Sequence, residues 1–192
     1  MSFDLESGER SSVTGAHDLW PSGFEFLDDS RLVWTADDDG RHRLRLQSLG
    51  EDDARILTGE GCVKAWCPRP NGEGVLAVID SFDAPADLFL VGLDGGEPQR
   101  LTELNKELTD TRDLAPGRSV TFEGADGRAV QAWEHKPPGF DASKRYPCLL
   151  WIHGGPLGSY RDEFHARWNA ALYAAAGYVV VAVNPAGSTG FG

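Results

Sequence analysis

His153, Gly154 and Gly155 follow directly on the apolar run Leu149–Ile152, in the stretch LLWIHGGP. Glycines have no Cβ, so a substrate carbonyl can approach their backbone and meet amide hydrogens. Oriented amides stabilise the oxyanion of an acyl-transfer transition state, and loss of one donor costs roughly a hundredfold to a thousandfold in rate. These residues predict an oxyanion-binding segment, with a plain strand-to-loop turn as the alternative.

His-Gly-Gly after a strand is one form of the oxyanion segment in α/β-hydrolases. In that fold the catalytic triad runs serine, acid, histidine, whereas His153 precedes any nucleophile. We therefore assign His153 a structural, loop-shaping role rather than that of the base. The serine motif G-x-S-x-G is absent from the sequence. Gly187–Gly190 has its composition without its spacing, so Ser188 is predicted to be a turn residue.

The elements around this segment follow the order strand, helix, strand. Cys148–His153 is nearly continuous in apolar residues, which predicts a strand covered on both faces. Glu163–Ala176 has helical spacing, with Gly177 at the cap, and Tyr178–Val183 is a second apolar strand. The predicted helix carries an apolar stripe of Phe164, Trp168, Ala171, Leu172 and Ala175. This order predicts a parallel sheet of an α/β domain, preceded by two short strands at Ser119–Glu123 and Ala129–His135.

Two segments of the first half have the same pattern of short strands and turns. Arg31–Gly59 matches Gly74–Glu103 at a period of 44 residues, so that Leu44 maps to Leu88, Leu57 to Leu101 and Thr58 to Thr102. This period suits blades of a β-propeller, with two unrelated β-meanders in a sandwich as the alternative. Asn105–Gly117 is polar and predicts a linker. The predicted domains are 1–115, a partial β-propeller of about two blades with the linker, and 116–192, the start of an α/β domain.

Charge and composition narrow the classes of partner. The formal net charge is -12, with a pI near 4.7, which disfavours nucleic acid and anionic membrane surfaces. The three cysteines form no CxxC pair, so no metal site is expected. The N-terminal residues lack the apolar core of a secretory signal, and the apolar run Tyr178–Val183 is too short to span a membrane. A cytoplasmic location is expected.

Three segments resemble the start of the catalytic domain of the prolyl oligopeptidase family of serine peptidases, in its acylaminoacyl-peptidase and dipeptidyl-peptidase-like branch. They are KPPGFDASKRYPCLLWIHGGPLGSYRDEF, NAALYAAAGY and VVVAVNPAGSTGFG. LDGGEPQRLTELN resembles the family's last propeller blade. The chain departs from the family at Ala186, where arginine is usual, and at Glu134-His135, where the strand tends to be apolar.

The resemblance implies an α/β-hydrolase domain preceded by a β-propeller that gates the active site. It implies hydrolysis of short peptides through a serine acyl-enzyme, with no cofactor. It places an oxyanion donor at the Gly155 amide, with His153 and Gly154 shaping the loop, and the serine, aspartate and histidine beyond this chain.

We therefore predict a C-terminally truncated serine-type peptidase that is inactive as the 192-residue chain alone. Two alternatives stay open. One is an esterase-type α/β-hydrolase, and the other is a non-catalytic propeller binding module with a decayed hydrolase remnant.

Overall fold

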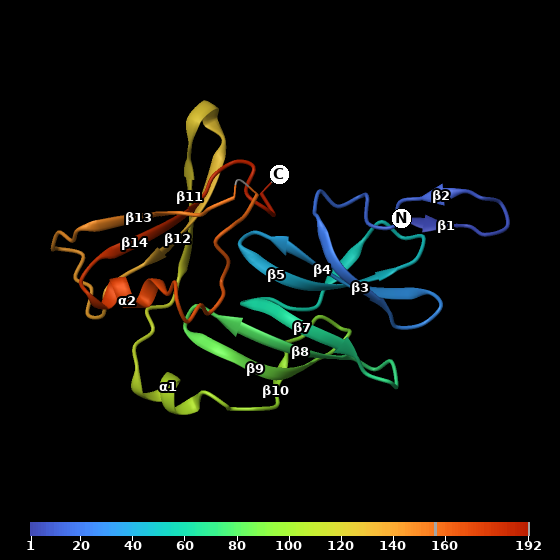
Figure 1. Cartoon of the computed structure of the whole chain (residues 1–192), viewed down its shortest axis with the longest axis horizontal. Coiled ribbons are helices and arrows are strands. Elements are labelled where there is room, and N and C mark those ends of the chain that lie inside the picture. Colours follow the sequence, from blue (N-terminus) through green and yellow to red (C-terminus); the bar gives the residue numbers. More distant parts are fainter. Residues whose placement is uncertain (156, 192) are drawn as a thin grey trace.

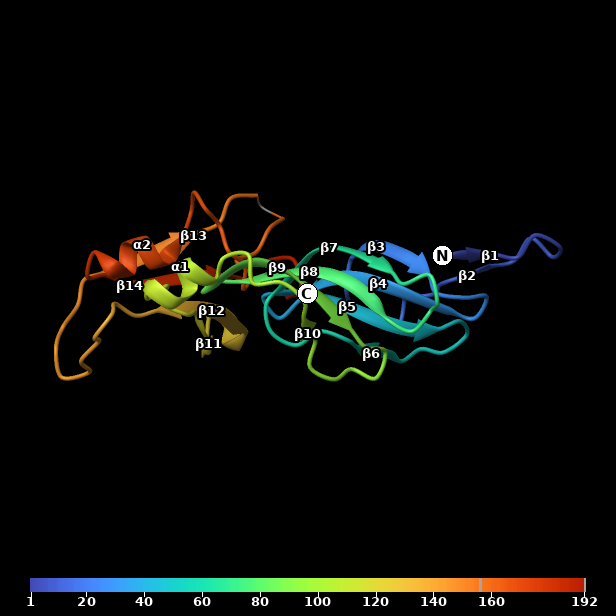
Figure 2. The same cartoon turned by 90° about the horizontal axis from the view of Figure 1, so that it is seen from below.

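The chain folds mostly into antiparallel β-sheet. The computed structural model describes residues 1–155 and 157–191. Pro156, the last residue of the HGGP motif, and Gly192, the last residue of the predicted second domain, lie outside the described residues. An eight-stranded and a four-stranded sheet lie side by side in a flat, elongated molecule (Figures 1 and 2). The hairpin of β1 (Ser2–Phe3) and β2 (Arg10–Ser11) extends from one end of the molecule (Figure 1).

The eight-stranded sheet consists of two antiparallel meanders. The first comprises β3 (Pro21–Phe26), β4 (Arg31–Asp38), β5 (Arg41–Ser48) and β6 (Ala54–Ile56). The second comprises β7 (Cys62–Pro68), β8 (Val75–Ser81), β9 (Ala84–Val91) and β10 (Gln99–Arg100). They are joined by a parallel pairing of β5 with β7 at His42 and Cys62.

The predicted 44-residue repeat is confirmed by equivalent hydrogen bonds in the two meanders. The N–H of Leu57 donates to the carbonyl of Leu44 at 2.8 Å, and the N–H of Leu101 donates to that of Leu88 at 2.8 Å. The hydroxyl of Thr58 accepts from the Leu44 N–H at 3.0 Å. The hydroxyl of Thr102, which is 44 residues later, accepts from the Leu88 N–H at 2.9 Å. The same two hydrogen bonds therefore hold the last segment of each meander to its neighbouring strand.

One apolar core serves both meanders. Its fully buried members include Val33 and Leu44 from the first meander and Val75 and Val91 from the second. Complete burial of such a side chain contributes about 1.5–3 kcal/mol. Because the core residues come from both repeats, each meander covers apolar surface that the other would leave exposed.

The connection between the two sheets is more ordered than the linker that the sequence predicts. Helix α1 (Lys106–Thr111) forms within Asn105–Gly117, with an ion pair of 3.4 Å between Lys106 and Asp110 on successive turns. Near the end of this connection, after the helix, Ala115 is buried and has a φ of 47°.

The second sheet combines antiparallel and parallel pairing. Its strands, in spatial order, are β11 (Arg118–Glu123), β12 (Ala129–His135), β14 (Val179–Asn184) and β13 (Cys148–Ile152). The short 3-10 turn η1 (Ala125–Gly127) joins the first two strands. β13 runs parallel to β14, with α2 (Ala170–Ala175) between them in the chain. The four predicted strands, and the order strand, helix, strand in the last part of the chain, are confirmed, with ends that differ by at most one residue.

The predicted helix over Glu163–Ala176 is wrong in length and in its apolar face. α2 begins only after Asn169, whose side chain accepts from the Ala171 N–H at 2.8 Å, and its buried face is Ala170, Ala171 and Ala174. Trp168 and Leu172 of the predicted stripe are exposed. Upstream, the His165 ring accepts the Trp168 N–H at 2.9 Å, so a local turn replaces the first helical turns. The Gly177 cap is confirmed: its φ is 94° and its N–H donates to the Ala174 carbonyl at 2.9 Å.

The prediction that the strand over Cys148–His153 is covered on both faces is also wrong. β13 lies at the edge of the sheet, and Leu150 and Ile152 are 57% and 74% exposed. The alternate residues Leu149 and Trp151 are half-buried. An apolar run therefore identified the strand, but in this chain the strand has one open face.

The repeated threonine bond can be tested at Thr58, which is buried. We expect Thr58→Val to lower the free energy of unfolding by about 1–3 kcal/mol, because the buried Leu44 N–H loses its acceptor. Urea unfolding measures the change, with Thr121→Val on the exposed part of β11 as control. Equal stabilities of the two variants would contradict the role of this bond.

Candidate active site

The predicted oxyanion segment forms the loop at the carboxyl end of β13. Gly155 has a φ of 153°, and a Cβ placed there would lie 2.6 Å from the Leu157 nitrogen. A Cβ on Gly154 would meet nothing within 4 Å. The two glycines therefore differ. A side chain at position 155 would collide with the backbone of the same loop, whereas the space beside the backbone at Gly154 is open.

This loop is bonded to the loop that follows β14. The Nε2 atom of His153 lies 3.0 Å from the hydroxyl of Ser188, and the Thr189 N–H donates to the Gly158 carbonyl at 3.0 Å. Ser188 is buried. Because β13 and β14 are parallel, their carboxyl ends meet at one edge, which is where open α/β sheets bind ligands.

Tyr160, further along the same loop, is held through its backbone. Its N–H donates to Asn184 Oδ1 at 2.7 Å, and its carbonyl accepts from Asn184 Nδ2 at 2.8 Å. The indole N–H of Trp133 donates to the same carbonyl at 3.0 Å. Asn184 is fully buried and also donates to Gln131 at 2.6 Å. One side chain at the end of β14 thus satisfies both backbone groups of Tyr160.

Asp162 binds this loop to the eight-stranded sheet. Its carboxylate accepts from the Gly61 N–H and the Phe82 N–H, each at 2.9 Å. Its own N–H donates to the Gly40 carbonyl at 2.8 Å. Burial raises the pKa of Asp162 above its usual value, and the two donated N–H bonds oppose that rise.

Residues on either side of Asp162 complete a charged cluster between the sheets. Arg161 binds Asp37 at 3.0 Å and Glu163 at 3.2 Å, and Lys64 binds Glu163 at 2.5 Å. Burial lowers the pKa of the Arg161 guanidinium, but the carboxylates of Glu163 and Asp37 outweigh it, so that the net shift is upward.

Asp80 is the least satisfied member of the cluster. Its Oδ2 lies 3.8 Å from Lys64 Nζ, and within the described residues its buried Oδ1 has no hydrogen-bond partner. Burial raises the pKa of Asp80 to about 7; Lys64 opposes the shift, and the Glu163 carboxylate adds to it. This carboxyl therefore changes charge near neutral pH.

A hollow of about 410 Å³ opens beside His153. Aromatic side chains make up much of its wall, and polar groups come from the oxyanion loop and the charged cluster. Its lining residues are Phe82, Trp151, Ile152, His153, Gly154, Tyr160, Glu163, His165 and Trp168. Phe82 lies between β8 and β9, so both sheets contribute to the wall.

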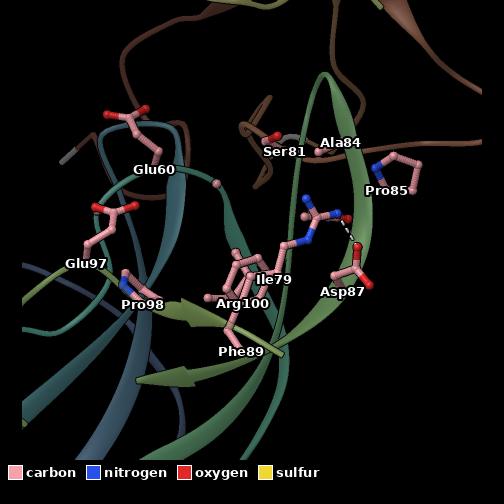
Figure 3. Close-up of a pocket in the computed structure, with 13 residues that line it drawn as sticks. Glu60, Ile79, Ser81, Ala84, Pro85, Asp87, Phe89, Glu97, Pro98 and Arg100 are labelled. Carbon is pink, nitrogen blue, oxygen red and sulfur yellow. Dashed lines mark hydrogen bonds and ion pairs between the residues drawn. The ribbon is translucent and has the colours of Figure 1, made fainter. Parts of the chain in front are cut away.

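A second hollow, of about 180 Å³, lies over β8, β9 and β10 (Figure 3). Figure 3 shows Arg100 reaching Asp87 across it. Asp87 also accepts from the Thr102 hydroxyl and the Leu104 N–H, and Glu60 pairs with Arg41 at 2.6 Å. Because these charged groups bond within the chain, we assign them a structural role.

Residues 1–155 and 157–191 contain no group of three or more histidine, cysteine, aspartate or glutamate side chains that could hold a metal ion. Among the helices that the structure describes, none is long and apolar enough to cross a membrane.

The structure brings His153, Gly154 and Gly155 together with Ser188. Ser188 does lie in a turn, since its N–H donates to the Pro185 carbonyl at 3.0 Å, but it also contacts His153. Sequence reasoning missed Asn184 and Asp162. Asn184 ends an apolar run and Asp162 stands within SYRDEF, but their spacing does not indicate what they contact.

Comparison with curated proteins identifies homologues along nearly all of the chain. Dipeptidyl-peptidase 5 of Schizosaccharomyces pombe is 31% identical over 100% of this chain and 28% of its own length. Dipeptidyl-peptidase 5 of Aspergillus fumigatus is 33% identical over 94% of this chain and 26% of its own. The chain is a distant homologue of the prolyl oligopeptidase family. The resemblance to that family is confirmed, and the chain spans about a quarter of the length of these relatives. No family model matches the chain.

Solved structures of related peptidases share the fold. Acylaminoacyl peptidase of Pyrococcus horikoshii matches 96% of this chain with a TM-score of 0.78, at 24% identity and over 28% of its own chain. Dipeptidyl peptidase 4 of Porphyromonas gingivalis matches 97% of this chain with a TM-score of 0.71, at 20% identity and over 27% of its own.

The bonds of Asp162 can be tested with a side chain of the same shape. We expect Asp162→Asn to lower the free energy of unfolding by about 1–3 kcal/mol, because an amide nitrogen replaces one of the two acceptor oxygens and leaves a buried N–H unpaired. Urea unfolding measures the loss, with Asp53→Asn at an exposed position as control. A stability equal to that of the control would show that these bonds contribute little.

The raised pKa of Asp80 predicts a pH dependence of stability. Between its usual value of 3.8 and about 7, the folded chain holds a proton that the unfolded chain releases, so the free energy of unfolding falls as pH rises through this window. We expect Asp80→Asn to remove that fall and to exceed the wild type in stability at pH 8. Urea unfolding between pH 4.5 and pH 8 tests this. Parallel pH profiles for the two proteins would contradict the assignment.

Proposed function

We propose that the chain supplies the oxyanion-binding half of a serine peptidase site for short peptides. The observation that carries this proposal is the position of His153–Gly155, at the carboxyl end of β13 and beside the loop after β14. Homology to peptidases along the chain supports it.

The proposed chemistry requires a donor at the reacting carbonyl. The serine oxygen bonds to the carbonyl carbon as its proton passes to a general base, and the Gly155 N–H donates to the oxyanion that forms. The C–N bond then breaks as the base returns the proton to the leaving amine, and water hydrolyses the acyl-enzyme to the acid and the free serine. The open space beside Gly154 gives a carbonyl access to the loop. No cofactor takes part.

We propose the domain division 1–115 and 116–192. The two equivalent meanders support two β-propeller blades followed by a linker. The parallel pair β13 and β14 with α2 between them supports the start of an α/β-hydrolase domain, although its helical part here is six residues.

The hollow beside His153 supports a peptide ligand. Its aromatic walls suit an apolar side chain, and Phe82 makes the first sheet part of the wall. A solved structure that this chain matches, with a TM-score of 0.75, is acylaminoacyl peptidase in complex with Z-Gly-Gly-Phe-chloromethyl ketone. We extend a peptide ligand of this kind to the present site.

The test uses the protein encoded by the complete reading frame around these residues. We expect a fluorophosphonate probe to label one serine, and aminoacyl and dipeptidyl p-nitroanilides to be hydrolysed. Gly155→Ala should lower the hydrolysis rate by roughly a hundredfold to a thousandfold, because a Cβ there displaces the donor. Gly139→Ala is the matched control, since Gly139 also has a positive φ of 67° and its Cβ would meet nothing.

Each other outcome points to one of the alternatives. Labelling with hydrolysis of p-nitrophenyl esters alone would favour an esterase. Failure of the complete protein to be labelled would contradict the proposal and favour a non-catalytic binding module.

A further inference from the structure

The His153 ring has a polar neighbour at each nitrogen. Nδ1 lies 3.0 Å from the Gly154 carbonyl oxygen, and Nε2 lies 3.0 Å from the Ser188 hydroxyl. A carbonyl oxygen only accepts, so the Nδ1 atom carries the proton of this bond. The ring of Tyr160 packs edge-on against the same imidazole, with 5.7 Å between the ring centres.

The bond to Gly154 bears on the direction of the Gly155 amide. The Gly154 carbonyl and the Gly155 N–H belong to one planar trans peptide, so they point in opposite directions. With glycine on both sides, no Cβ restricts rotation of that peptide. Bonding the carbonyl to His153 therefore directs the N–H to the opposite side. Gly158 packs against this carbonyl, since a Cβ there would lie 3.0 Å from its oxygen.

Ser188 holds the other side of the ring. Its hydroxyl lies 2.6 Å from the Pro185 carbonyl as well as 3.0 Å from His153 Nε2. With a neutral imidazole protonated at Nδ1, the hydroxyl turns its single proton from the Pro185 carbonyl to Nε2. With a charged imidazole, Nε2–H donates to the hydroxyl, which then donates to Pro185. In either arrangement the ring keeps Nδ1 toward Gly154.

We propose that His153 and Ser188 are positioning residues, and that the chain of hydrogen bonds Ser188–His153–Gly154 sets the direction of the Gly155 N–H. This inference rests on the proposed function, in which that N–H is the oxyanion donor. It assigns a role to Ser188, which by sequence is only a turn residue.

The first test needs no activity. We expect long-range ¹H–¹⁵N spectra of the 192-residue chain at pH 8 to show His153 in the Nδ1–H form, the minority tautomer of free histidine. Ser188→Ala should shift the Gly155 amide resonance, and Ser143→Ala, which removes a hydroxyl bonded to Asp141, should not. An Nε2–H tautomer with a bare Nδ1 facing Gly154 would overturn the proposal.

The second test is kinetic and uses the complete protein. His153→Asn places an amide near the Nδ1 position, and His153→Gln places one near Nε2. We expect His153→Asn to keep most of kcat. His153→Gln and Ser188→Ala should lower kcat about tenfold or more, with KM within about twofold, because the donor is misdirected rather than removed. Equal losses for Asn and Gln, or a loss confined to KM, would overturn the proposal.

The two tests separate this inference from the proposed function. If the wild-type protein hydrolyses no peptide while His153 shows the Nδ1–H tautomer, the peptidase assignment fails and the hydrogen-bond chain stands. If the wild type is active and the tautomer is Nε2–H, the positioning role fails and the peptidase assignment stands.

Discussion

The carboxylate of Asp162 accepts one backbone N–H from each of two segments of the eight-stranded sheet, at Gly61 and Phe82, while its own N–H bonds Gly40. Charge-assisted bonds of this kind are shorter and stronger than neutral ones, and they exclude alternative positions of the chain. The loop that carries the candidate oxyanion segment therefore depends on bonds to a sheet 80 and 101 residues upstream. The site and the first sheet form one structural unit.

The same loop is held a second time by the sheet to which it belongs. Asn184 satisfies both backbone groups of Tyr160, and Ser188 and Thr189 contact His153 and Gly158. Arg161 and Glu163 stand on either side of Asp162, within a cluster of opposite charges. These ion pairs are partly buried, and removal of one partner would leave the other charge uncompensated. Preorganised amides are useful in catalysis because they need no rearrangement during the reaction.

Patterns that depend on neighbours in the chain predicted much of this structure. The 44-residue repeat and the strands of both halves follow from alternation and from turn residues. The glycine at position 177 correctly predicted where helix α2 ends, because the residue after a helix often has a positive φ, which favours glycine. The helix prediction failed where other contacts competed with the apolar periodicity. One is local, since His165 accepts the backbone N–H groups of Arg167 and Trp168, and the other is tertiary, since Glu163 is bound by Lys64.

The sequence by itself determined the β-rich architecture, the glycines at the carboxyl end of β13 and the resemblance to a peptidase family. Only the tertiary structure decided that Asp162 joins the two sheets, that Asn184 binds Tyr160, and that Ser188 bonds His153. The reason is physical. Alternation and turn chemistry act over a few residues, whereas these contacts join groups 24 to 101 residues apart, and their pairing depends on the packing of two sheets.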